Sequence, residues 1–175
     1  MTQPLNPYHR RPRIRATVPL ALLAGALLAL AVGASAASAK AVTLHLFSRE
    51  TSSTFTDAQG HPVPPSTPPA VGDTFDNTGV DYVGNYKHHA AKPTGSDHLR
   101  CTITSISSTG PMVLCSGQIA IGGSMLLAND ETIRLSASPP PTQINGGTGI
   151  YRHARGLLTP TSTGHNTDFT IRVSY

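Results

Sequence analysis

Period-two alternation of apolar and polar residues is the feature that most restricts how this chain can fold. In residues 169–175 every odd position is apolar and every even position is polar, and residues 42–46 repeat the pattern near the other end. Successive side chains on a β-strand point to opposite faces, so this pattern turns one apolar face toward a core. Helical periodicity with capping residues is missing after residue 39. The sequence therefore predicts an all-β fold.

Further short segments bring the expected number of strands to about eight. They lie at residues 80–86, 99–103, 113–119, 125–128 and 132–136, and after Gly149. The chain has 16 Gly, 15 Pro and only 13% charged residues, which is typical of a β domain rich in turns. Pairing of the two terminal strands would close the sheet into a barrel without free edges. A β-sandwich has the same periodicity, so the pattern does not distinguish a barrel from a sandwich. The proline-rich segment 59–70 is predicted to be a loop that joins neither sheet nor helix.

The first 39 residues have the pattern of a secretory signal peptide. Four arginines at positions 10–15 precede an apolar run at 16–32, and the small residues 34–39 offer A-x-A cleavage sites, best after Ala39. The apolar run is short for a membrane-spanning helix and contains Pro19 and Gly25, which disfavours an uncleaved anchor. We expect an exported protein whose single domain spans residues 40–175. The pattern fits export by the general secretory route and by the twin-arginine route.

Removal of this segment changes the charge of the protein. The whole chain has 13 Lys and Arg against 9 Asp and Glu, but four of the arginines lie before residue 40. The mature domain therefore carries nine basic and nine acidic residues. A near-neutral domain gives no electrostatic reason to bind nucleic acid or, after cleavage, a membrane surface.

The two cysteines, Cys101 and Cys115, are expected to form a disulfide. An even number of cysteines in an exported chain favours a structural bridge. The turn-forming residues 107–111 lie between them, so a hairpin would bring the two cysteines nearly opposite each other. No C-x-x-C motif is present, which argues against redox chemistry.

The run 144–156, Ile-Asn-Gly-Gly-Thr-Gly-Ile-Tyr-Arg-His-Ala-Arg-Gly, is the most informative motif. Its glycines suit positive φ or close backbone approach, and it lacks the spacing of a phosphate-binding loop. It resembles the G-G-T-G-x-[YF]-x-x-A-R-G signature of the allene oxide cyclase and dirigent-like β-barrels. Segments 71–75 (Val-Gly-Asp-Thr-Phe), 83–84 and 117–119 follow in the order of that family, so the resemblance covers most of residues 42–175.

The resemblance implies a single closed antiparallel barrel, calycin-like, with a mostly apolar pocket for a small hydrophobic or phenolic molecule. It implies a stereoselective cyclisation by an isomerase, or the steering of radical coupling, with no metal or cofactor. Homodimers or homotrimers are common among such barrels. The alternative is a non-catalytic, lipocalin-like carrier or a structural barrel at the cell surface. An inward acid within reach of Arg155 would favour an enzyme, and a barrel filled by large side chains would favour a structural protein.

Arg155 and Tyr151 are the predicted catalytic residues within this motif. A guanidinium can hold a carboxylate or stabilise a developing oxyanion, whereas its structural alternative is an ion pair at the barrel rim. Tyr151 can line the pocket or pack in the core. Asp81, Tyr82 and Asp73 are weaker pocket candidates, with Asp73 also suited to cap a turn. The structural glycines of the motif are Gly146, Gly147, Gly149 and Gly156.

Metal binding and serine hydrolysis find little support in the sequence. His88 and His89 would point to opposite faces of a strand, and neither H-E-x-x-H nor G-x-S-x-G occurs. The family's catalytic acids do not map onto this chain, and Glu50 follows the first strand without a matching motif. The sequence therefore predicts no metal site.

Overall fold

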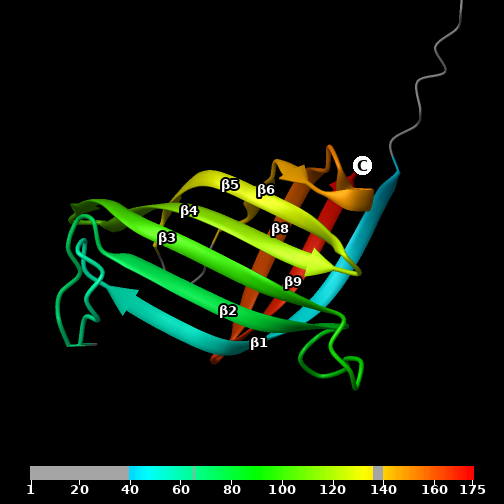
Figure 1. Cartoon of the computed structure of the whole chain (residues 1–175), viewed down its shortest axis with the longest axis horizontal. Helices are drawn as coiled ribbons and strands as arrows, with labels where there is room; N and C mark the ends of the chain where they lie inside the picture. The colour runs from blue at the N-terminus through cyan, green and yellow to red at the C-terminus, as the bar shows by residue number, and fades with distance from the viewer. Residues whose placement is uncertain (1–39, 65, 136–139) are drawn as a thin grey trace, which may run out of the picture. The chain divides into compact units, whose positions relative to one another are not determined.

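The computed structural model describes residues 40–64, 66–135 and 140–175, which form an antiparallel β-barrel (Figure 1). The predicted signal segment lies outside these residues. The strands are β1 (Ala41–Thr56), β2 (Thr74–Val83), β3 (Gly95–Ser107), β4 (Gly110–Ile121), β5 (Ser124–Arg134), β6 (Thr142–Ile144), β7 (Gly146–Gly147), β8 (Arg155–Thr163) and β9 (Asn166–Ser174). One 3-10 turn, η1 (Gly149–Tyr151), precedes β8. In the part of the chain so described, no helix has the length and apolar character needed to cross a membrane.

The terminal strands pair as predicted, with Ala41 opposite Ser174 and Arg49 opposite Asn166. The strand order is β6-β8-β9-β1-β2-β3-β4-β5-β7. The two ends of this order belong to one short segment, because β6 pairs with β8 and β7 pairs with β5. Between them, Asn145 donates its backbone N–H to the carbonyl of Leu127 at 3.0 Å. The fold is thus a nearly closed barrel and not a sandwich, and its closure lies at residues 142–147 rather than at the terminal pair.

The strand bounds differ from the predicted ones where bulges or polar inward residues break the alternation. Predicted strands 125–128 and 132–136 are one strand, β5, because a bulge opposite Cys115 and Gly117 inserts a residue and shifts the register. The predicted last residue, Ser136, lies outside the described part. β2 begins at Thr74 instead of Val80, since its inward positions include Asn77, Gly79 and Asp81.

Loops account for the other differences. The strand predicted directly after Gly149 starts only at Arg155, because η1 intervenes. The proline-rich segment after β1 is a loop as predicted, apart from one isolated bridge between Thr56 and Pro62.

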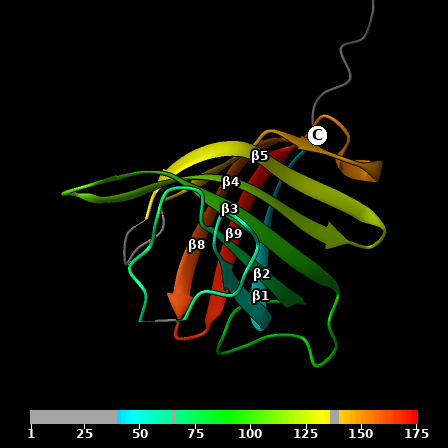
Figure 2. The ribbon, with the colours of Figure 1, turned by 60° about the vertical axis from the view of Figure 1, so that its left-hand side comes forward.

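The interior contains two groups of buried apolar residues with a space between them. Members of the first, around η1 and β9, are Leu46, Ile119, Leu126, Ala128, Ile144, Tyr151, Ala154, Ile171 and Val173. Members of the second, at the other ends of β3 and β4, are Cys101, Ile103, Val113 and Cys115. In Figures 1 and 2, β8 and β9 lie behind β2–β4 and form the opposite wall. A cavity remains between the two groups, so the described side chains do not fill the barrel.

Candidate functional site

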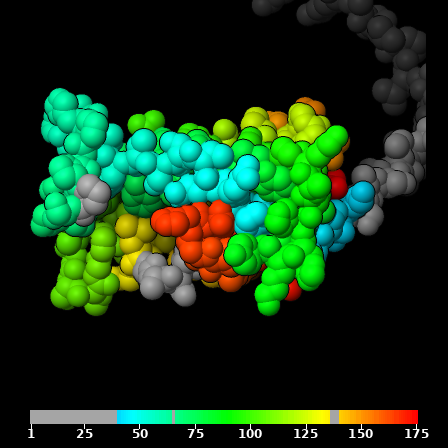
Figure 3. Space-filling model, turned by 90° about the horizontal axis from the view of Figure 1, so that it is seen from below, coloured from blue at the N-terminus to red at the C-terminus, as the bar shows by residue number. Residues whose placement is uncertain are grey.

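A cavity of about 380 Å³ lies inside the barrel, between the two buried groups. Its apolar wall comes from Leu99, Cys115, Ile119, Leu126, Ala128, Ile133, Ile144, Leu158, Pro160 and Phe169. The turn between β8 and β9 contributes Gly164 and His165, and Figure 3 shows that hairpin (orange) on the face seen from below. The volume falls within the range of small-molecule sites.

Polar side chains gather on one part of this wall, where β1, β2 and β3 run side by side. Ser48 lies opposite Asp81 in the β1–β2 register, and Gly79 lies opposite Asp97 in the β2–β3 register. The Ser48 hydroxyl donates a hydrogen bond to Oδ2 of Asp97. A Cβ at position 79 would collide with both of these atoms, so glycine is what allows Ser48 and Asp97 to meet.

Asp81 is the fully buried member of this polar cluster. Neither of its carboxylate oxygens has a hydrogen-bond partner among the described residues. Burial, and then the negative charge of Asp97, raise the pKa of Asp81 to about 8. At neutral pH the Asp81 side chain is therefore mainly protonated, and Asp97 lines the cavity beside it.

The charge around the cavity is negative. Glu50, Asp97 and Glu131 line it from β1, β3 and β5, and the described lining residues include no Lys or Arg. His165 and His98 are the lining residues that can gain a positive charge, and the His98 ring bonds to the outward Asp76 at 2.9 Å. The described residues also contain no group of three or more His, Cys, Asp or Glu placed to hold a metal ion.

Arg155 lies outside the cavity. Its guanidinium donates to the backbone carbonyls of Asn145 and Ala154, the latter at 2.9 Å. It borders instead a shallow surface depression beside Ala41 and Arg172. The inward acids and Arg155 are therefore not within mutual reach, and Arg155 ties the closing segment to the start of β8.

The other predicted residues are spread over three places. Tyr151 is buried at the closed end, where its ring packs edge-on against Tyr175 at 5.0 Å between centroids. Tyr82 faces the outside of the barrel and contacts the rings of Phe47 and His89. Asp73 accepts a hydrogen bond from the backbone N–H of Ala70 at 2.7 Å in the turn before β2. Of the predicted pocket residues, Asp81 alone belongs to the polar cluster.

The glycines of the motif lie in and around the closing segment. Gly147 packs against the backbone of Met125 and Tyr151, and Gly156 against that of Arg172 and Val173. Gly149 has a φ of +58° at the start of η1, and Gly146 pairs with Leu127. Gly147, Gly149 and Gly156 thus allow a close approach that a Cβ would prevent, whereas a Cβ at Gly146 would meet nothing nearer than 3.7 Å.

Residues that the sequence interpretation missed are Ser48, Asp97 and Glu131, which line the cavity. Each has a weak signal in the sequence: an isolated polar residue at an inward position of an otherwise apolar strand face. That signal becomes readable only once the register is known, because the bulge in β5 reverses the direction that unbroken alternation from Ala128 would give Glu131.

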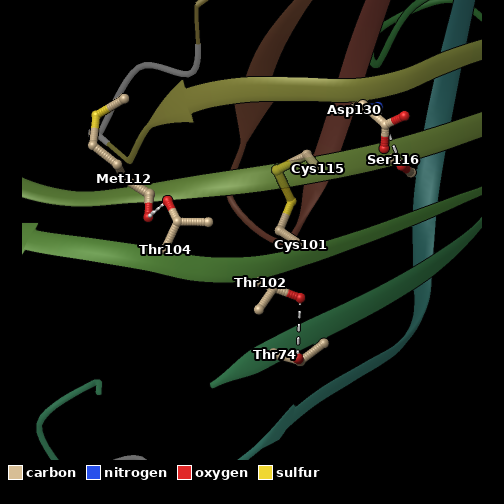
Figure 4. The surroundings of a disulfide bond; sticks show 8 residues. All are labelled: Thr74, Cys101, Thr102, Thr104, Met112, Cys115, Ser116 and Asp130. Carbon is tan, nitrogen blue, oxygen red and sulfur yellow. Dashed lines mark hydrogen bonds between the residues drawn. A yellow bond between two sulfur atoms is a disulfide. The ribbon is translucent and has the colours of Figure 1, made fainter. Parts of the chain in front are cut away.

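Cys101 and Cys115 form the predicted disulfide, directly opposite each other on β3 and β4 with their Cα atoms 4.0 Å apart. Figure 4 shows the bridge joining the two strands, with Thr102 bonded to Thr74 on β2 beside it. Cys115 also lines the cavity, so the bridge stiffens one of its walls.

Comparison with known proteins identifies the fold. Neither a protein-family model nor a curated protein sequence matches the chain. Among solved structures, a pyocyanin demethylase superposes with a TM-score of 0.60 at 23% identity, covering 75% of this chain and 99% of that one. The pterocarpan synthase dirigent proteins GePTS1 and PsPTS1 superpose with TM-scores of 0.52 and 0.51, both at 21% identity. Each covers 78% of this chain, and 89% and 96% of those chains are matched. The chain is therefore a β-barrel of the dirigent and allene oxide cyclase-like fold.

Proposed function

We propose that this protein is an exported barrel that binds one small, mainly apolar molecule and promotes a proton-transfer rearrangement of it, such as an isomerisation or cyclisation. The observation that carries the proposal is the carboxylate of Asp97 at the wall of an apolar cavity, backed by the buried Asp81. The pterocarpan synthase and demethylase names of the similar structures accord with chemistry on small ring systems.

Asp97 is the proposed catalytic residue. The carboxylate can take a proton from a weakly acidic O–H or N–H group of the bound molecule and return it elsewhere on the same molecule. The Ser48 hydroxyl, which donates to Oδ2, fixes the orientation of that carboxylate. Asp81 is a positioning residue, because its retained proton avoids a second charge beside Asp97.

Export and oligomerisation are part of the same proposal. The disulfide between Cys101 and Cys115 accords with an oxidising compartment, as the leader-like segment does. We propose secretion with cleavage after Ala39 and assembly as a homodimer or homotrimer. The intact mass of the exported protein checks the cleavage site, and its native mass checks the assembly.

Ligand binding is tested by native mass spectrometry of the protein purified from an exporting host, alone and with a panel of phenolic and other apolar molecules. We expect a retained or added small molecule. Ala128→Phe fills the cavity from the inward face of β5 and should abolish the added mass. Thr132→Phe places the same ring on the exposed face of β5 and should leave binding unchanged.

Turnover is tested on any molecule so found, by following its conversion with wild type and Asp97→Asn. We expect Asp97→Asn to keep the bound mass and to lose conversion by about 100-fold or more, the scale of general acid–base catalysis. A ligand that stays bound unchanged in wild type would instead make the protein a carrier. Failure of every molecule to bind to either wild type or Thr132→Phe would overturn the proposed binding function.

A further inference from the structure

We propose that the cavity prefers molecules that carry a positive charge, such as a protonated or quaternary ring nitrogen, over neutral and anionic molecules of the same shape. This inference rests on the proposed function, because it names the class of molecule that the same cavity takes. It concerns charge, and it would stand whether the bound molecule is converted or only carried.

Three carboxylates give the cavity its charge preference. Glu50, Asp97 and Glu131 line the cavity from three different strands, with Asp97 and Glu131 half-buried and Glu50 exposed. None of them has a Lys or Arg within ion-pair distance among residues 40–64, 66–135 and 140–175. The hydrogen bonds that Asp97 and Glu131 accept come from neutral groups, Ser48 and the side-chain amide of Asn145 at 3.4 Å. The negative charge is thus left for a ligand to balance.

A second observation points to an interior built for a positive group. Asp81 is fully buried on the inward face of β2, next to Ser48 in the register, and its two oxygens have no partner in the described structure. Burying an unpartnered carboxyl is costly unless something in the folded or bound state offsets it. A cation held at Asp97 would stabilise the ionised form of Asp81 and so reduce the cost of burying that form. Phe169, also in the wall, supplies an aromatic ring of the kind that can stabilise a cation.

An anionic molecule would be repelled by the carboxylates that line the cavity. The residue that could clamp a carboxylate, Arg155, bonds to the carbonyls of Asn145 and Ala154 outside the cavity. Of the two lining histidines, His98 is engaged with Asp76 and His165 lies exposed on the β8–β9 turn. The half-buried charges of Asp97 and Glu131 lie beside an apolar wall, where solvent screens them less than at the open surface, so they discriminate between ligand charges.

The test uses three probes with one ring system and different charge: N-methylacridinium, acridine and acridine-9-carboxylate. Their dissociation constants are measured by fluorescence with the exported protein at neutral pH. We expect the cation to bind roughly tenfold or more tightly than neutral acridine, and the anion to bind weakest. Glu131→Gln and Glu50→Gln should each reduce the cation-to-neutral ratio by roughly threefold to tenfold, as one charge at several Å would.

Asp57→Asn is the matched control, because it removes one carboxylate that bonds to Gln59 and His61 in the turn after β1, and none of these residues lines the cavity. It should leave the cation-to-neutral ratio unchanged, and Ala128→Phe should abolish binding of all three probes. Equal binding of cation and neutral probe, or an unchanged ratio in Glu131→Gln and Glu50→Gln, would overturn the charge preference and leave the proposed function standing. Failure of all three probes to bind would overturn the charge preference, whereas the proposed function would still be decided by its own panel.

Discussion

At the scale of single residues, the protein places polar groups where a barrel of this kind would otherwise be apolar. Ser48, Asp81 and Asp97 come from three adjacent strands and meet because Gly79 leaves room for them. Asp97 is satisfied by Ser48 and faces the cavity, whereas Asp81 is buried without a partner. Such unpartnered burial is unfavourable for folding and is common where a site has been built for function.

Asp81 should make the protein less stable as pH rises. Its pKa is about 8 in the folded protein against an ordinary value of 3.8 for a free side chain, so between these values the folded state binds the extra proton. Stability is then greatest below the lower value and is lost through this window, by up to about 1.4 kcal/mol for each pH unit. Asp81→Asn should remove that loss and be more stable than wild type at about pH 9. Urea unfolding of both proteins at about pH 5 and about pH 9 measures how the free energy of unfolding changes with pH. An equal change in the two proteins would contradict the assignment of this pH dependence to Asp81.

At the scale of elements, the β3–β4 hairpin is the most strongly fixed pair. Its strands are joined by the Cys101–Cys115 disulfide in the middle of the second buried group, and Thr104 donates to the carbonyl of Met112 nearby (Figure 4). Because Cys115 also lines the cavity, the bridge links barrel stability to the shape of the site.

Replacement of both cysteines by alanine should lower the free energy of unfolding by about 3 kcal/mol. The reason is the loop that the bridge closes in the unfolded chain, between cysteines with a sequence separation of 14. Denaturant unfolding of the double variant, compared with wild type, measures the loss. Wild type treated with a reductant should approach the variant, and an unchanged midpoint in both would contradict a stabilising role.

At the scale of the whole molecule, closure of the barrel depends on residues 142–147. This segment joins β8 to β5 through β6 and β7, while the terminal strands β1 and β9 complete the ring on the other side. Gly147 approaches the carbonyls of Met125 and Tyr151 so closely that a Cβ would collide with them, whereas Gly146 has nothing nearer than 3.7 Å.

Gly147→Ala should therefore destabilise the barrel by roughly 1–3 kcal/mol, the range for overpacking, and loosen its closure. Gly146→Ala, one residue away, is the control and should have little effect. Thermal unfolding of the two variants and hydrogen exchange at Leu127 and Leu126, which pair with these glycines, measure the difference. Equal losses in the two variants would rule out close approach as the reason for the glycine.

The sequence by itself determined the fold class, the disulfide and the importance of the glycine-rich run. Side-chain direction along a strand has a period of two, so alternation alone identifies β-structure. Two cysteines on either side of a turn are a local feature of the sequence. A glycine at a position where there is no room for a Cβ is another. Local features can be read without knowing the register.

Only the tertiary structure decided which residues face the cavity. The bulges between Glu50 and Ser52 and between Cys115 and Gly117 shift the register, and each shift reverses which side chains point inward. Arg155 belongs to the recognisable motif but lies outside the cavity, whereas Asp97 belongs to no motif and lines it. The site is an assembly of residues from strands distant in sequence, and only pairing between those strands brings them together.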